Sequence, residues 1–164
     1  MTAAQFSGRL DAVAGRVREA ASRPRPAEST LTDADAATGE RWEEGQVWAH
    51  MSEFVPYWIA EARLVLAGEP GAEATPFGRV KSDPARVAAI AERRGDPIDA
   101  LAEVVLTDIA ILRGFLDELG DSPAVWASVG HHSTLGDMTV EDIFEEFLIG
   151  HLEQHVDQLD GLAS

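Results

Sequence analysis

The sequence predicts an all-α fold, a four-helix bundle with long connections, and one domain over residues 1–164. Two patterns support this. Apolar residues recur three and four positions apart in the long stretches, which is the repeat of one helix face. No stretch shows the alternation of apolar and polar residues that indicates a strand of useful length. Amphipathic helices of this kind bury their apolar faces against one another in a bundle.

The first helix is predicted over residues 2–22 and ends before Pro24, because proline donates no backbone hydrogen bond and restricts the residue before it. Its apolar stripe consists of Phe6, Leu10, Val13 and Val17. The second helix is predicted from about Glu40 to Ala67, with Gly68 as its stop. Pro56 lies inside this helix and is expected to kink it.

The next two helices begin at the same signal, an aspartate followed by a proline at the first helical position. The pair at 83–84 opens a short helix over 84–93, and the pair at 96–97 opens a longer one that continues to Leu119. The final helix is predicted over 140–162, after a capping box at 139–142.

Three predicted connections, 24–39, 68–82 and 120–138, are long for a bundle, in which about two to eight residues are usual. Such segments are either disordered or form the rim of a site. A third interpretation is that the helices extend further than predicted.

Composition excludes several classes of function. The net charge of −16 disfavours binding to nucleic acid and to anionic membranes. The chain has no cysteine, which excludes disulfide scaffolds, thiolate zinc sites, iron–sulfur clusters and cysteine nucleophiles. Neither a signal peptide nor an apolar run of about 20 residues is evident, so a cytoplasmic location is expected.

Histidines are the candidate metal ligands. His151 and His155 are four residues apart, which places both imidazoles on one helix face, beside the apolar stripe. A shared metal ion would provide both with a partner; the alternative is that the pair lies on the solvent flank. His50, in the middle of the second helix, is either a core residue or the third ligand of a His₃ site with open positions. The HExxH motif is absent, because Leu152 follows His151.

Four segments in order carry a resemblance to a known family. They are the segment with Trp42 and His50 (GQVWAHMSEF), the loop 75–79 (TPFGR), the segment 132–140 (HSTLGDMTV) and the segment 150–159 (GHLEQHVDQL). In these segments the chain resembles the DinB-like superfamily of four-helix bundles, also described as the YfiT-like metal-dependent hydrolase fold. The resemblance covers nearly the whole chain.

This resemblance implies a metal triad of His50, His151 and His155, with zinc, nickel or a similar divalent ion. Characterised members include thiol transferases that use bacillithiol, glutathione or mycothiol, and a mycothiol-dependent maleylpyruvate isomerase. The isomerase pattern has a glutamate where this chain has His151, which favours the three-histidine type. The sequence has 12 arginines but one lysine, a bias typical of GC-rich genomes. We therefore expect an actinobacterial source, in which mycothiol is the usual thiol.

The predicted function is a divalent-metal-dependent enzyme, a mycothiol S-transferase or a hydrolase that acts on a small molecule. The alternative is a non-catalytic bundle that binds a metal or a small ligand. Gln158, one turn after His155, either orients a ligand or is a polar residue at the helix end. Arg79 and Lys81 either bind a substrate carboxylate or belong to a solvated loop.

The remaining candidates are less specific. His131 and His132 are rim residues or a general acid, or else ordinary loop histidines without a role in the site. Trp48, Trp58 and Trp126 are expected in the core or in a subunit interface. Because several tryptophans occur in a small bundle, and because many relatives dimerise, a homodimer is predicted, with a monomer as the alternative.

Overall fold

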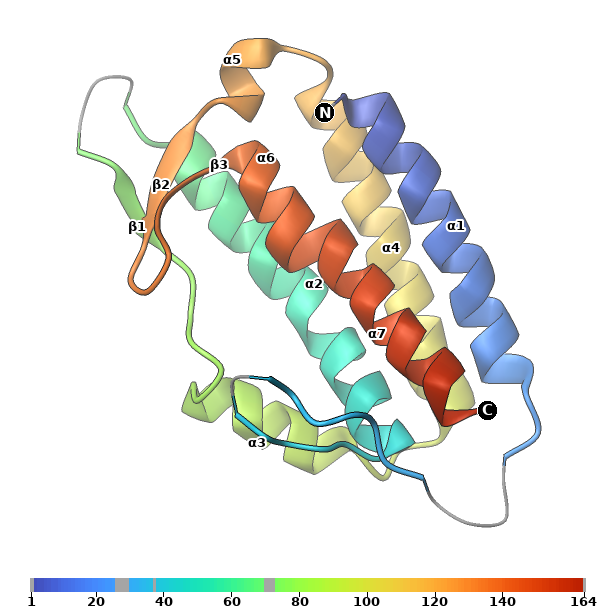
Figure 1. Cartoon of the computed structure of the whole chain (residues 1–164). Coiled ribbons are helices and arrows are strands. Elements are labelled where there is room, and N and C mark those ends of the chain that lie inside the picture. The colour runs from blue at the N-terminus through green and yellow to red at the C-terminus, as the bar shows by residue number, and fades with distance from the viewer. Residues whose placement is uncertain (1, 26–29, 37, 70–72, 164) are drawn as a thin grey trace.

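The computed structural model describes residues 2–25, 30–36, 38–69 and 73–163. Long helices lie side by side in it as a bundle (Figure 1). They are α1 (Ala3–Ser22), α2 (Glu44–Leu66), α4 (Ile98–Leu119) and a C-terminal column of α6 (Val140–Ile143), the π-helical turn η1 (Phe144–Leu148) and α7 (Ile149–Leu162). Two short helices, α3 (Pro84–Arg93) and α5 (Pro123–Trp126), lie in the connections. The prediction of an all-α four-helix bundle is confirmed.

Side chains cap three of the helix starts that the sequence indicated. Thr2 caps α1, Asp83 accepts a hydrogen bond from the backbone of Arg86 at the start of α3, and Thr139 and Asp142 form a capping box before α6. Each cap satisfies backbone N–H groups that have no partner within the helix. The predicted N-termini of these helices are therefore close to the observed ones. The start predicted at 96–97 differs, because Pro97 is itself the N-cap of α4, without a side-chain cap, and the helix begins at Ile98.

Helix α2 begins at Glu44, four residues later than predicted. The residues directly before it do not join the helix, because the backbone of Trp42 is hydrogen-bonded to Thr32 in the preceding connection. Its backbone N–H donates to the Thr32 hydroxyl over 2.9 Å, and its carbonyl accepts from the Thr32 N–H, also over 2.9 Å. The helix then continues through Pro56 to Leu66.

A small sheet corrects the expectation that the chain has no strands. Strands β1 (Thr75–Phe77), β2 (Val129–His132) and β3 (Gly136–Thr139) form it, with β1 parallel and β3 antiparallel to β2. Strands of three or four residues are too short to show alternation, and β1 pairs with a segment more than 50 residues away. The sheet lies beside α2 and α6 (Figure 1) and closes two of the long connections.

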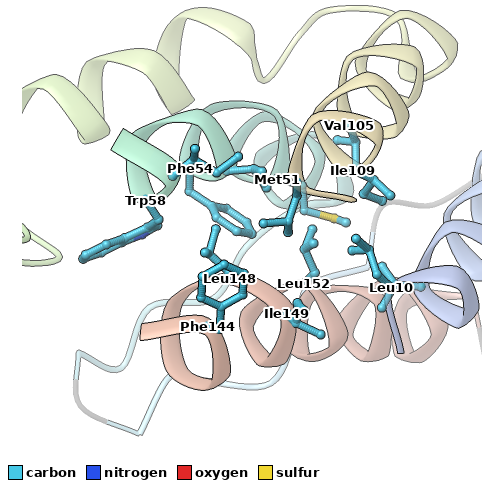
Figure 2. Packing of buried hydrophobic residues seen from close by; sticks show 14 of the residues in the cluster. Leu10, Met51, Phe54, Trp58, Val105, Ile109, Phe144, Leu148, Ile149 and Leu152 are labelled. Carbon is cyan, nitrogen blue, oxygen red and sulfur yellow. The ribbon is translucent and has the colours of Figure 1, made fainter. Parts of the chain in front are cut away.

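The core lies between the four long helices. Figure 2 shows Met51 and Phe54 of α2 opposite Leu148 and Leu152 of the C-terminal column. Among the described residues, the largest fully buried side chain is Trp48; Trp58 and Trp126 are also buried. The tryptophans therefore pack within the chain, and the homodimer stays a prediction. No helix within the described ranges is long and apolar enough to cross a membrane.

The C-terminal column has the predicted length but is not α-helical throughout. Its turn over Phe144–Leu148 is π-helical, which adds one residue to the turn before His151. Gly150 makes this turn possible, because a Cβ atom there would lie 2.0 Å from the carbonyl oxygen of Glu145. The backbone approach at Gly150 thus sets the rotation at which the following helix, α7, presents its histidines.

We predict that Gly150→Ala destabilises the protein by about 1–3 kcal/mol, because the added methyl group must displace a backbone carbonyl. Gly15→Ala is the matched control. Gly15 lies in the middle of α1, and a Cβ atom added there would have nothing within 4 Å, so alanine should stabilise the helix by about 0.5–1 kcal/mol. Denaturant unfolding measures both, and an unchanged free energy of unfolding for Gly150→Ala would contradict the role of this glycine.

Candidate metal centre

Three histidines from two helices meet at one point. The Nε2 atom of His151 lies 3.0 Å from Nε2 of His50 on α2 and 3.1 Å from Nε2 of His155 on α7. The candidate ligand nitrogens all lie within 4.8 Å of one another. His50 and His155 are buried, and His151 is partly buried. The structure therefore brings the i, i+4 pair and the histidine of the second helix into one cluster.

Neighbouring side chains hold two of these rings in place through their other nitrogen. Nδ1 of His50 lies 2.7 Å from the carboxylate of Glu53, and Nδ1 of His155 lies 2.8 Å from the side-chain oxygen of Gln158. Both oxygens accept hydrogen bonds, so each Nδ1 carries the proton and each Nε2 presents a lone pair to the cluster. A proton on Nε2 of His151 would satisfy one of these lone pairs but not both, and with that proton on Nδ1 neither would be satisfied.

The cluster suits a divalent metal ion. Two nitrogen ligands that each lie about 2.0–2.1 Å from a zinc ion, with an N–Zn–N angle of about 90–109°, are roughly 2.9–3.4 Å apart. Two of the three separations, 3.0 and 3.1 Å, fall in this range, and the ligand atoms of all three histidines lie within 4.8 Å of one another. A metal ion would also provide the partner that the inward lone pairs lack. These histidines can therefore hold a metal ion, with the remaining coordination positions open to a ligand.

The histidines are in the protonation state that ligation requires. Burial lowers the pKa of His50 and of His151 well below the usual value, and the neighbouring His155 lowers both further. Burial also lowers the pKa of His155, to about 4. All three imidazoles are thus neutral at neutral pH, and a neutral imidazole is the form that binds metal.

An ion pair supports the His50 side of the cluster. The guanidinium of Arg79 donates to both carboxylate oxygens of Glu53, over 2.6 and 2.7 Å, and both side chains are 10% exposed. It also lies 4.1 Å from the ring centroid of Tyr57. Burial raises the pKa of Glu53, and the hydrogen bond from Arg79 opposes that effect. Sequence reasoning missed Glu53, although its position three residues after His50 places it on the same helix face.

A pocket of about 220 Å³ opens onto the histidines. Parts of two of the three long connections form its rim, as expected, whereas no residue of the connection 120–138 is among the described lining residues. The rim residues are Thr32, Asp33, Asp35, Glu40 and Trp42 from the first connection and Arg79, Val80 and Lys81 from the second. The Trp42 ring stacks on His155, with centroids 6.1 Å apart and planes 7° apart. Gln158 also lines the pocket, and Lys81 does so while paired with Asp35 over 2.7 Å.

The two loop histidines lie outside this pocket. His131 is exposed and contacts Asp137 over 2.7 Å. His132 is buried behind the pocket wall, next to Phe147 and Trp58, and its Nε2 lies 3.3 Å from the Arg79 carbonyl oxygen. The structure thus places His132 where it supports the loop of Arg79, and the described lining of the pocket does not include it.

We predict that the metal-free protein loses stability as the pH falls from about 6.5 towards 4. The unfolded histidines take up protons near pH 6.5, whereas folded His155 stays neutral until about pH 4, so acid favours the unfolded state. At pH 4, the protonation of His155 in the unfolded state alone lowers the free energy of unfolding by about 3 kcal/mol relative to neutral pH. Unfolding in the presence of a chelator measures the effect. Carboxylates also titrate in acid, so the wild type is compared with His155→Gln. If the free energy of unfolding falls equally steeply with pH in both proteins, the prediction is wrong.

No protein-family profile and no curated protein matches the chain. Two solved structures are similar to it in fold. YfiT from Bacillus subtilis, described as a probable metal-dependent hydrolase with an unusual four-helix bundle topology, superposes with a TM-score of 0.73 at 15% identity, over 98% of this chain and 85% of that one. A mutant of the mycothiol-dependent maleylpyruvate isomerase superposes with a TM-score of 0.66 at 14% identity, over 97% of this chain and 61% of that one. This chain therefore has the fold of the YfiT four-helix bundle.

Proposed function

We propose that the chain is a divalent-metal-dependent enzyme that acts on a small molecule, with His50, His151 and His155 as the metal ligands. The observation that carries the proposal is the convergence of three neutral imidazoles, by their Nε2 atoms, at a pocket. Zinc and nickel are the expected ions, because imidazole suits both. A bound ion of this kind lowers the pKa of a water or thiol that it holds, and so supplies a nucleophile at neutral pH.

The surrounding residues would serve that chemistry by position. Glu53 and Gln158 keep the two Nδ1 protons outward, which preserves the inward lone pairs. Trp42 lies over the histidines and keeps bulk water from one side of the cluster. Gln154 and Glu146 line the same pocket and offer polar groups that can orient a substrate.

We predict that protein purified without a His-tag binds about one divalent ion per chain, and that His155→Ala loses it, because two imidazoles remain. His131→Ala is the matched control. It removes a histidine that lies outside the pocket, so the bound ion should stay. Elemental analysis decides the point, and equal metal content in the wild type and His155→Ala would refute the ligand assignment.

Thiol transfer with mycothiol is the reaction that we favour for this enzyme over hydrolysis. The chain contains no cysteine, so a thiolate nucleophile must come from outside. The open coordination positions face a pocket that such a thiol can enter. Likeness of fold to a mycothiol-dependent isomerase, and the arginine-rich composition, also support mycothiol.

We predict that mycothiol binds the zinc-loaded protein with a submillimolar dissociation constant, and that S-methyl mycothiol, whose sulfur cannot ionise, does not. Isothermal calorimetry measures both. No binding at millimolar thiol, with zinc confirmed in the protein, would rule out thiol transfer and favour hydrolysis. A zinc-loaded protein that neither binds a thiol nor hydrolyses small esters and amides would instead be a non-catalytic metal-binding bundle.

A further inference from the structure

Arg86 is the cation in the pocket that sequence reasoning passed over. It lies in the first turn of α3 and lines the same pocket as the three histidines. One guanidinium nitrogen, Nη1, donates to the carbonyl of Lys81 over 2.7 Å, and the guanidinium carbon lies 5.5 Å from the ring centroid of Trp42. Trp42 in turn contacts His50 and His155. A single indole ring thus links Arg86 to the histidine cluster.

Arg86 differs from the other cations of this pocket in its ion pairing. Arg79 is paired with Glu53 and Lys81 with Asp35. Arg86 forms no ion pair with any residue that the structure describes. Arg86 lines the pocket, and its side chain has no described carboxylate within ion-pair distance. An arginine that is partly removed from water and left unpaired is costly.

The pocket lining carries charges of both signs, and Arg86 is the cation in it without an ion pair to a described residue. The other charged lining residues are Asp33, Asp35, Glu40, Arg79, Lys81 and Glu146. Burial lowers the pKa of Arg86, and Arg79 adds to this, while Glu53, Glu40 and Asp35 oppose it from beyond ion-pair distance. The charge of Arg86 also lowers the pKa of His50 and of both α7 histidines. Arg86 lines the same pocket as the histidines and shares its contact with Trp42, so a divalent ion held by the histidines would place a second positive centre in that pocket.

We propose that Arg86 binds a carboxylate of the substrate whose other end reaches the three histidines. The inference rests on the proposed function and deepens it, since it defines the substrate as a small carboxylic acid. A guanidinium binds a carboxylate through two parallel hydrogen bonds, which fixes the orientation of the bound molecule as well as its affinity. The volume of about 220 Å³ lies below the roughly 300–1,000 Å³ of pockets that hold drug-sized ligands, which suits a small acid.

The test uses two-headed probes on the zinc-loaded protein. Mercaptoacetate, 3-mercaptopropionate and 4-mercaptobutyrate each carry a thiol for the metal and a carboxylate for Arg86, at increasing separation. The matching mercapto-amides have the same shape without the charge. At least one acid should bind about tenfold or more tightly than its amide, since a hydrogen bond to a charged group contributes at that level. If no acid is preferred over its amide, the inference is wrong, whatever the variants do.

Arg86→Gln should abolish this preference and leave the zinc content unchanged. Arg18→Gln is the matched control, because it removes one positive charge from an exposed position on α1 that does not line the pocket. The control should keep the preference. Retention of the preference in Arg86→Gln, or its equal loss in Arg18→Gln, would overturn the assignment to Arg86.

A second arm separates this inference from the proposed function. Metal-free protein is titrated with butyrate and with butyramide, and NMR follows the Nε–H signals of Arg86 and Trp42. If the chain fails to bind zinc but butyrate still shifts these signals in the wild type and not in Arg86→Gln, the carboxylate site stands and the metal-dependent function falls. If zinc binds and neither arm shows a preference for the acid, the metal proposal stands and the carboxylate site falls.

Discussion

The site depends on the burial of three imidazoles whose lone pairs face one another. Each buried polar group without a partner costs about 1–3 kcal/mol, so the cluster is acceptable only because other groups compensate. Glu53 and Gln158 satisfy the outer nitrogens, and Arg79 neutralises the carboxylate that this requires. The inner nitrogens remain short of hydrogen-bond donors. That deficit is the physical reason to expect a metal ion at this point and not a hydrogen-bonded core.

Backbone geometry provides the rest of the arrangement. The π-helical turn before α7 rotates the helix by one residue, and Gly150 allows the close approach to the Glu145 carbonyl that this turn needs. Segments from the long connections then cover the cluster and form the pocket rim. Two hydrogen bonds between the Trp42 backbone and Thr32 hold Trp42 in position. The described parts of the connections that line the pocket are thus held in place by their own hydrogen bonds.

Binding of an anion in the pocket would depend on single cations, because both the chain and the lining of the pocket hold more acidic than basic side chains. A net charge of −16 gives an anionic molecule no long-range attraction to this protein. Attraction must therefore come from local groups, and two of the three pocket cations are already bound to carboxylates. Arg86 and a metal ion would then determine which molecules enter. With two cations held in ion pairs and one available, the pocket suits a site that selects a small anion through short-range contacts.

The sequence alone determined the features that depend on neighbours along the chain. Helix starts follow from local caps, and the shared face of His151 and His155 follows from their spacing of four residues. Only the tertiary structure brought His50 to this pair, across 101 positions in the sequence, and only it joined Arg79 to Glu53. It also paired Arg79 with a carboxylate of the chain and placed Arg86 in the pocket of the histidines without an ion pair to any described residue. The short sheet and the π-helical turn were likewise decided by long-range packing, because three- to five-residue segments carry too little periodicity to predict.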